Sequence, residues 1–407
     1  MSSKRTTSVE SLPAFTIDGR VLSTALQAVK PYAAPKSSIS VLRAVLMSAV
    51  GAGVTFITSD LTTRAEYEAS AIVHDRGRIL VPFGELEKLA QTCKADPRVT
   101  LRLNADRTQL LVEGSVTGSI SVGEPDDFPA QATGDDHTKG VILQREKLLD
   151  ALAWTAPAIS PDETRPTLNC LDLHLREELV ALVATDSYRL HARAVERIAG
   201  NVSDGDYQLN RDFVVPFAKQ AGALLVGDAH LMFHYHTVAA VYPSWCRISS
   251  TGGAMTWTTA VHDGQFPDWV KLVPGLSAYT IYIVIERKHF DPVLASILKL
   301  SNRGNTPLRL LVDLDEAGQG KATISYESSD HSKVARSFPV NVYQPAAAPA
   351  KLEQPFEIGF NPEFFAQAVK CQKRVSLAGV SPLHPLMAYP DLDLHQFALV
   401  MPIRLND

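Results

Sequence analysis

The chain has 407 residues, of which 45% are hydrophobic and 20% are charged, and its formal net charge is −5. This length suits two or three globular domains of ~100–200 residues each, and the composition excludes disordered, collagen-like and disulfide-stapled proteins. No apolar run approaches the ~18–20 residues of a membrane helix. The acidic balance excludes a general polyanion binder, so contact with nucleic acid would require a local basic surface.

The chain begins with MSSKRTTSVESLPAF, which has basic and hydroxyl residues but lacks the apolar core of a secretory signal. We interpret residues 1–14 as an N-terminal extension. The four cysteines are far apart and form no Cys-x-x-Cys pair, which argues against a zinc site and a disulfide framework. We therefore expect buried thiols, a cytoplasmic protein, and neither a metal ion nor a cofactor.

A short strand that runs into an amphipathic helix is predicted three times, at 15–29, 141–156 and 283–298. In each segment a β-branched run precedes apolar residues spaced by three and four, as on one face of a helix. A second pattern follows at 54–69, 180–194 and 322–338. There an alternating strand ends in a Ser/Thr/Asp cluster and a second alternating strand follows, which predicts a hairpin.

A third pattern has a strand that meets Pro or Gly and continues into a second helix, at 79–92, 213–225 and 356–370. Matching positions in these segments recur at intervals of about 134 and 143 residues, close to the usual size of a domain. We therefore predict three repeated α+β domains after the N-terminal extension. Their predicted boundaries are 15–139, 140–275 and 276–407.

The run Thr-Asp-Ser-Tyr-Arg-Leu (185–190) places polar residues at the end of an apolar strand. Asp186 is either a catalytic acid or part of a hairpin turn. We favour the turn, because Thr, Asp and Ser side chains readily bond their own backbone. A turn does not explain the Tyr-Arg-Leu that follows.

Evidence for catalysis is sparse. His234 and His236 lie two residues apart on a predicted strand and could begin a metal site, but no third ligand is near in sequence. A structural strand face explains them better, although a metal-dependent hydrolase stays a hypothesis. No dinucleotide, phosphate-loop or nucleophile-elbow motif is present.

Lysine and arginine side chains recur on the predicted helices and the loops after them. If these helices lined one surface, the surface would attract phosphates without reading sequence; ordinary solvated helix faces are the alternative. The candidate DNA contacts are Lys30, Lys36, Arg43, Lys88, Arg165, Lys219 and Arg303. Further basic residues on these segments include Arg287, Lys370, Lys373 and Arg374.

Taken together, these segments resemble the bacterial sliding clamp, the beta subunit of DNA polymerase III. The resemblance covers about residues 15–405 and is carried by SSISVLRAVLMSA, TFITSDL, RPTLNCLDLHL, LVATDSYRLHARA, DGQFPDWVKLVP, FEIGFNPEFFAQAVK and the terminal FALVMPIRL. The Ala-Thr-Asp-x-x-Arg-Leu and Met-Pro-x-Arg-Leu motifs are specific in combination.

The resemblance implies three clamp domains, each with two helices packed on antiparallel sheets. Two chains would join head to tail into a homodimeric ring, with the helices lining a central hole for double-stranded DNA. The protein would then be a processivity factor rather than an enzyme. Its partners would be DNA of any sequence, the replicative polymerase, the clamp loader and repair proteins, with no membrane contact.

The resemblance also implies a hydrophobic pocket between the second and third domains that receives short linear peptides. Apolar and methionine side chains suit such a cleft, and Arg189 and Arg404 could orient the peptide. The matching positions are Leu168, Thr185, Ser187, Tyr188, Arg189, Leu190, Pro267, Lys271, Leu272, Leu383, Pro385, Leu399, Val400, Met401, Pro402, Ile403 and Arg404.

Two departures from the family pattern favour a change in partner preference. Ser187-Tyr188 stands where the family usually has Gly-His, and the stretch 373–390 is unusual. A specialised duplicate clamp, or a peptide-binding adaptor that does not encircle DNA, is therefore the alternative to a main replicative clamp.

Overall fold

The computed structural model describes residues 12–130, 138–176, 178–235, 244–275, 278–301, 306–314, 320–343 and 355–405. The chain divides into two compact units. Unit 1 comprises 1–149, 197–203 and 212–263, and unit 2 comprises 150–196, 204–211 and 264–407. Each unit contains a sheet that joins strands from two of the predicted domains, so the division runs through the predicted middle domain. The three-domain boundaries stay a prediction.

Unit 1 contains two antiparallel sheets. The first has the order β5-β1-β7-β8-β9, and the second runs β6-β2-β3-β4-β17-β16-β15-β10 and ends on the last residues of β13. The bounds are β1 Ala14–Ile17, β2 Ala44–Val50, β3 Gly53–Ser59, β4 Thr63–Ser70, β5 Ile72–Asp75, β6 Gly77–Pro82, β7 Val99–Leu103, β8 Gln109–Glu113, β9 Thr117–Ser121, β10 Thr138–Leu143, β13 Arg189–Gly200, β15 Ala229–His234, β16 Trp245–Ser250 and β17 Met255–His262.

The helices of unit 1 are α1 (Gly19–Val29), α2 (Phe83–Thr92) and most of α4 (Arg211–Leu224). The Asp18 carboxylate caps α1 by accepting from the backbone amides of Arg20 and Val21. Gly19 is required there, because a Cβ atom would lie 2.0 Å from the Cys93 carbonyl oxygen. The buried face of α1 packs against α2, β3 and β4. This confirms the strand and helix predicted at 15–29.

The strand predicted at the start of 213–225 is wrong. Those residues belong to α4, with Pro216 inside the helix, and the preceding strand is β14 (Gly205–Asn210). Phe213, Val214 and Phe217 are buried, and the Phe217 ring meets Trp257 edge-on at 5.0 Å. Burial of this face outweighs the weak helix preference of the two valines.

Unit 2 is built on two antiparallel sheets that share β21. Their orders are β14-β11-β12-β13-β25-β24-β23-β18-β21 and β22-β19-β20-β21. The remaining bounds are β11 Cys170–Arg176, β12 Leu179–Thr185, β18 Ile281–Glu286, β19 Leu308–Leu314, β20 Gly320–Glu327, β21 Lys333–Tyr343, β22 Phe356–Phe360, β23 Arg374–Gly379, β24 Leu386–Pro390 and β25 Gln396–Val400. The hairpins predicted at 180–194 and 322–338 are confirmed.

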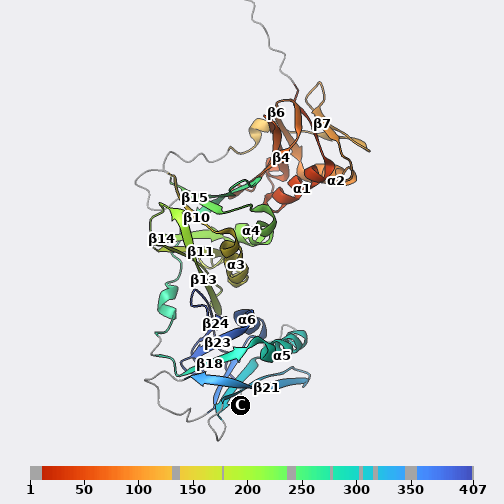
Figure 1. The fold of residues 1–407 in the computed structure, drawn as a ribbon. Helices are drawn as coiled ribbons and strands as arrows, with labels where there is room; N and C mark the ends of the chain where they lie inside the picture. Colours follow the sequence, from red (N-terminus) through yellow and green to blue (C-terminus); the bar gives the residue numbers. More distant parts are fainter. Residues whose placement is uncertain are drawn as a thin grey trace, which may run out of the picture. The chain divides into compact units, whose positions relative to one another are not determined.

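The helices of unit 2 are α5 (Arg287–Leu300), α6 (Pro362–Ala368) and the end of α3 (Arg145–Thr155). α5 and α6 contact each other on the same side of the sheets (Figure 1). Their apolar faces enter one core with the strands, which includes Phe290, Ile297, Phe360, Phe365 and Val375. Short 3₁₀ turns lie at Lys30–Tyr32, Ser40–Arg43, Pro125–Asp127, Ala156–Ala158 and Trp269–Leu272.

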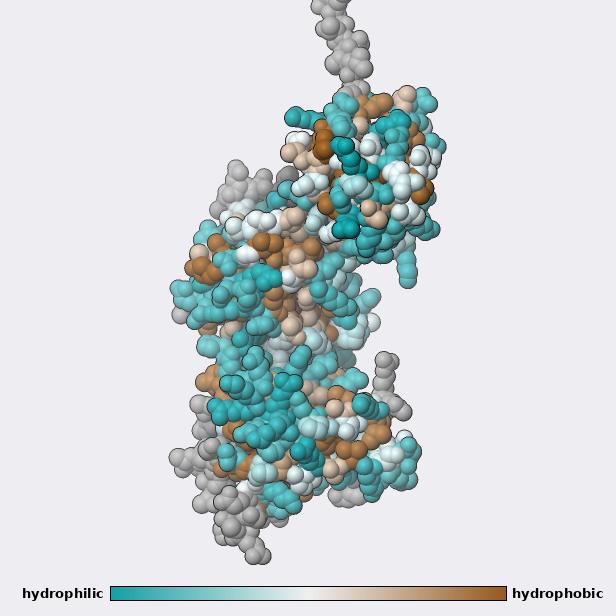
Figure 2. All heavy atoms as spheres, turned by 45° about the vertical axis from the view of Figure 1, so that its right-hand side comes forward, coloured by the Kyte–Doolittle hydropathy of each residue, from teal (hydrophilic) through white to brown (hydrophobic). Residues whose placement is uncertain are grey.

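Within the described residues, no helix is long and apolar enough to cross a membrane. The side of each unit that bears its helices faces the reader more directly in Figure 2 and is largely hydrophilic, with smaller apolar patches between the polar areas. The cores lie beneath this surface, so clusters of large apolar side chains that are nevertheless exposed indicate candidate binding sites.

Candidate peptide groove and basic cavity

The corner between β12 and β13 is a turn held by its own side chains. Asp186 accepts hydrogen bonds from the backbone amides of Tyr188 and Arg189, both at 3.0 Å, and the Thr185 hydroxyl donates to the Arg189 carbonyl at 2.7 Å. Ser187 adopts a left-handed conformation with φ of 77°. The turn interpretation of Asp186 is thus confirmed.

Arg189 is enclosed beneath this corner, and only 8% of its surface is exposed. Its Nε donates to Asp186 at 3.0 Å, and Nη2 donates to the Pro157 carbonyl at 2.5 Å. Nη1 donates to Gln367, while the guanidinium carbon lies 4.2 Å from the centre of the Phe364 ring. These contacts make Arg189 a support of the corner; a direct contact with a peptide stays a prediction.

Pairing of β13 with β25 brings the carboxy-terminal segment to the same corner. Arg189 pairs with Val400 and Leu190 with Leu399, and then the Met401 amide donates to the Tyr188 carbonyl at 2.8 Å. Further on, the Ile403 amide donates to the Gly359 carbonyl at 2.8 Å. Two segments about 210 residues apart in sequence therefore form one edge.

Several predicted pocket residues expose apolar side chains to solvent. The exposed fractions are 63% for Tyr188, 53% for Leu272, 73% for Leu383 and 40% for Met401. Leu190 and Leu399 are buried in a core cluster that also includes Phe266 and Met387. Tyr188 and Met401 are joined by a backbone hydrogen bond, and their exposed side chains over a close-packed base suit an apolar anchor of a short peptide. We call the predicted peptide site, which comprises Tyr188, Met401, Phe364 and the corner beneath them, the groove; the two described cavities do not include these residues.

The other predicted pocket residues fall into distinct settings. Thr185 and Val400 are buried; Leu168, Pro385 and Pro402 are half-buried; Ser187, Pro267 and Lys271 are exposed. The Lys271 ammonium pairs with Asp268 at 2.7 Å. Ile403 and Arg404 instead line a separate cavity of about 720 Å³ beside β19, β20 and β21. The structure therefore does not bring Arg404 together with Tyr188 in one described cavity.

Sequence reasoning missed two residues of the groove, both on α6. Phe364 stacks with Tyr188 at a ring separation of 6.5 Å, and Gln367 accepts from Arg189. Residues three apart on a helix face the same side, so their spacing was visible in the predicted helix. Their partner was not visible, because it is more than 170 residues away in sequence.

His191 lies behind the corner and is almost fully buried. Its Nδ1 donates to the Trp154 carbonyl at 2.9 Å, and the two rings lie 4.6 Å apart. Burial, together with the positive charge of Arg189, lowers the pKa of His191 to about 3 although the hydrogen bond to Trp154 opposes the shift. The imidazole is therefore neutral at physiological pH.

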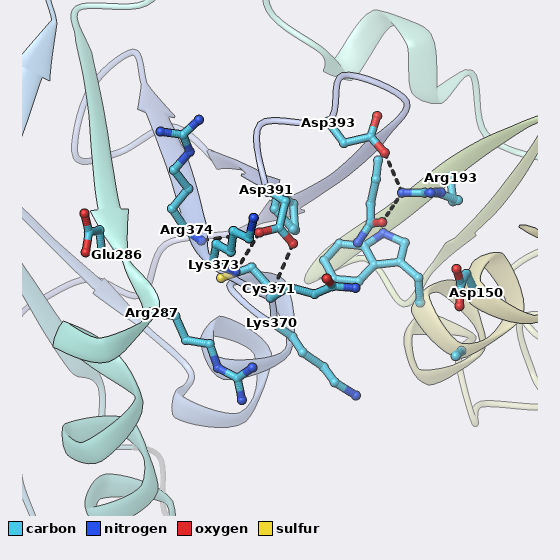
Figure 3. Close-up of a pocket in the computed structure, with 15 residues that line it drawn as sticks. Asp150, Arg193, Glu286, Arg287, Lys370, Cys371, Lys373, Arg374, Asp391 and Asp393 are labelled. Carbon is cyan, nitrogen blue, oxygen red and sulfur yellow. Dashed lines mark hydrogen bonds and ion pairs between the residues drawn. The ribbon is translucent and has the colours of Figure 1, made fainter.

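A second surface of unit 2 is a cavity of about 980 Å³ (Figure 3). It is lined by residues of α3, β13, β18 and α5, by the segment between α6 and β23, and by β23 to β25 with the turn before β25. Five basic side chains line it, which are Arg193, Arg287, Lys370, Lys373 and Arg374. Arg193 pairs with Asp393 at 2.7 Å and Arg287 with Asp291 at 2.5 Å. Lys370, Lys373 and Arg374 are exposed and have no carboxylate within ion-pair distance among the described residues. We call this the basic cavity.

Asp391 shapes the basic cavity from within. Its carboxylate accepts from the backbone amides of Gln372, Lys373 and Arg374 at 2.7 to 3.3 Å. Burial opposes ionisation, but these three donors hold the pKa of Asp391 below its usual value. The carboxylate holds the backbone from which Lys373 and Arg374 project, and Figure 3 shows these side chains beside Asp391.

The candidate DNA contacts lie on exposed surfaces where they are described. Lys30 pairs with Glu87 at 2.6 Å, whereas Lys36, Arg43, Lys88 and Lys219 have no such partner in the described part of the chain. Arg165 lies 3.4 Å from both the Ser187 hydroxyl and Asp162, so it sits beside the groove. Arg303 lies outside the described residues.

Of the two histidines in the metal-site hypothesis, the structure describes His234, whereas His236 lies outside the described residues. The His234 Nδ1 lies 3.2 Å from the Thr138 hydroxyl on the neighbouring strand. Burial and the charge of Arg247 lower the pKa of His234. These contacts are those of a strand-face histidine.

Family models of the DNA polymerase III beta subunit match this chain twice. The N-terminal domain model matches residues 14–132, and the central domain model matches residues 142–268. The chain belongs to the DNA polymerase III beta subunit family. The family assignment and the sliding clamp fold expected from the sequence are thereby confirmed.

Curated relatives and solved clamp structures match nearly the whole chain. The beta sliding clamp of Caulobacter vibrioides is 23% identical over 399 residues, which cover 96% of this chain and 99% of the relative. A Caulobacter crescentus clamp structure with bound polyethylene glycol has a TM-score of 0.83 at 22% identity and covers 97% of this chain and all of that one. The Pseudomonas aeruginosa clamp bound to griselimycin has a TM-score of 0.81 at 19% identity and the same coverage.

Proposed function

We propose that this beta sliding clamp closes as a head-to-tail homodimeric ring around duplex DNA and tethers the replicative polymerase. It would act in the cytoplasm without catalysing a reaction, as three clamp domains with the predicted boundaries. Two observations support this proposal: the chain belongs to the family, and its match to a curated clamp covers 99% of that relative.

The groove is the proposed docking site for partner peptides. One observation carries this proposal: Tyr188 and Met401 expose large apolar side chains on a base whose polar groups are bonded internally. Apolar anchors set in a rigid surface supply most of the affinity in helix- and strand-type peptide recognition. That the Pseudomonas aeruginosa clamp binds griselimycin is consistent with a clamp surface that accepts ligands.

The basic cavity and the residues Lys30, Lys36, Arg43, Lys88, Arg165, Lys219 and Arg303 are the proposed DNA contacts. Exposed ammonium and guanidinium groups attract phosphates without reading base sequence. A ring needs only weak contacts of this kind, because a closed ring holds DNA by topology.

A fluorescence titration tests the groove. A labelled peptide from the tail of a replicative polymerase should bind with a dissociation constant of roughly 1 μM, or about −8 kcal/mol. Met401→Ala should weaken this binding at least about tenfold. Leu394→Ala is the matched control, because Leu394 is equally apolar, 76% exposed, and lies in the turn before β25 rather than at its end. Equal loss in both variants would place the peptide elsewhere.

A specialised duplicate clamp is the second candidate. Tyr188 favours it, because its stacking on Phe364 fills space at the corner and would change which peptides fit. The sedimentation coefficient distinguishes a ring-forming clamp from an adaptor. A ring-forming clamp should sediment as two chains at micromolar concentration, whereas a stable monomer would argue for an adaptor that does not encircle DNA.

A further inference from the structure

Three groups with metal-binding chemistry meet on one face of the unit 2 sheet that begins with β14 and β11. Asp172 and His174 lie two residues apart on β11, so their side chains share a face, and Asp206 on β14 pairs directly with His174. One ligand atom from each of these residues lies within 4.8 Å of the others. The sequence predicted no metal site, because these residues become neighbours only when β11 pairs with β14.

Asp172 gives a second and independent indication of a ligand. It is 1% exposed, and neither of its carboxylate oxygens has a hydrogen-bond partner among the described residues. Burial of a carboxylate without a partner is strongly unfavourable, so such groups are paired, protonated or bound to a cation. Burial first, and then the nearby Asp206, raise the pKa of Asp172 well above its usual value.

The protein supplies only part of the countercharge. Arg176 donates to Asp206 at 3.0 Å, and the His174 Nδ1 lies 2.7 Å from the same carboxylate. Both contacts reach Asp206 and leave Asp172 without a bonded partner among the described residues. A cation between the three groups would neutralise both carboxylates together.

The segment 264–275 covers this face. Gln208, which pairs with Asp172 across the sheet, donates to the Gly264 carbonyl at 2.7 Å. The Trp269 ring meets His174 edge-on at 5.2 Å, and its buried Nε1 likewise has no partner among the described residues. The segment that bears Pro267, Lys271 and Leu272 therefore covers the site on the side of His174, whereas the Asp206 side chain stays 44% exposed.

We propose that Asp172, His174 and Asp206 bind one divalent transition-metal ion. Two carboxylate oxygens and an imidazole nitrogen form a donor set suited to Mn²⁺ or Zn²⁺. The ion has a structural role, because it ties β11 and β14 together under the segment 264–275. The site stands apart from the groove and the basic cavity, so its failure would leave the proposed clamp function untouched.

Mn²⁺ titration of the full chain tests the site after dialysis against a chelator. Electron paramagnetic resonance of free Mn²⁺ should give one bound ion per chain, with an affinity that Asp172→Asn lowers at least roughly tenfold. Asparagine keeps the size of the side chain and removes a buried charge, so this variant should fold. His174→Gln should weaken binding in the same way.

The exposed pair His331 and Glu327, 3.1 Å apart, provides a matched control. Glu327→Gln should leave Mn²⁺ affinity unchanged, because adventitious surface binding is all that this pair offers. Absence of stoichiometric binding by the unaltered chain would overturn the proposal. Equal affinity in Asp172→Asn would overturn it too and would leave a proton on Asp172 as the neutralising group.

Discussion

The groove and the basic cavity lie in the same unit but differ in whether their charged groups are enclosed by the protein or reach solvent. At the groove, the Arg189 guanidinium is enclosed by Asp186, Gln367 and the Pro157 carbonyl, and the side chains that reach solvent are apolar. At the basic cavity, the backbone is fixed by Asp391, and the side chains that reach solvent are charged.

This difference indicates two kinds of ligand. Charges that are already paired inside the protein cannot attract a polyanion, but they hold an apolar surface in one shape for an anchor residue. Charges on flexible stems attract phosphates over a distance and tolerate any sequence. Substitutions at either surface therefore test this difference.

Loss of the buried guanidinium should have the largest effect. Arg189→Ala leaves the Asp186 carboxylate and the Pro157 carbonyl without their partner beneath the corner, and removal of one member of a buried pair costs about 3–5 kcal/mol. We expect a loss of about 3 kcal/mol in the free energy of unfolding of unit 2, measured by urea denaturation, together with loss of peptide binding.

Lys271→Ala is the control for that measurement, since Lys271 pairs with Asp268 on the surface and its side chain is 82% exposed. It should change stability by less than about 0.5 kcal/mol. A similar small loss in Arg189→Ala would mean that the enclosed contacts contribute little to the corner.

Acidification should weaken the base of the groove through His191. The folded protein holds the pKa of His191 at about 3, whereas the unfolded chain has an ordinary value of about 6.5. Between these values the unfolded state binds the additional proton, so stability falls as the pH falls below about 6.5. From pH 7 to pH 5 this group alone should cost about 2 kcal/mol.

His191→Gln isolates that contribution, because glutamine can still donate to the Trp154 carbonyl but does not titrate. The urea midpoint of the variant should depend less on pH across this interval than that of the unaltered protein. Parallel curves for the two proteins would assign the acid sensitivity to other groups.

The sequence predicted local structure well where the pattern was strong. The repeats located the strands and helices at 15–29, 283–298 and 356–370, and the Thr-Asp-Ser cluster located the turn at Asp186. These features depend on periodicity and on side chains that bond their own backbone, both of which are local. The strand expected in 213–225 failed because burial of Phe213 and Phe217 favoured a helix.

Contacts between distant segments could not be predicted in the same way. The resemblance placed Tyr188 and Met401 in one pocket, but the stacking of Phe364 on Tyr188 and the bond from Arg189 to Gln367 depend on how α6 packs. The pairing of β11 with β14 equally decides that Asp172 meets Asp206. The register between two strands is set in the folded sheet, so it cannot be predicted from the local periodicity of either strand.

Removal of the aromatic support should have a smaller effect, confined to the groove. Phe364→Ala removes the ring beneath Tyr188 and Arg189, and aromatic and cation–π pairs contribute about 1 kcal/mol each. Peptide affinity should fall about fivefold in the fluorescence titration. Phe364→Leu keeps much of the volume and should recover part of the loss if packing, rather than the ring, supports Tyr188.

Neutralising the basic cavity should have the smallest effect at any one salt concentration, and it should leave peptide binding unchanged. Lys370 and Lys373 have no described ion-pair partner, so each can neutralise one phosphate. The double change Lys370→Ala with Lys373→Ala should lower the slope of log affinity for duplex DNA against log salt by about 2. Lys333→Ala is the matched control, because Lys333 is already paired with Glu327 at 3.0 Å on the β20–β21 hairpin.

An equal change of slope in the control would mean that DNA does not prefer the basic cavity. The difference between the two surfaces would then be supported only by peptide binding at the groove.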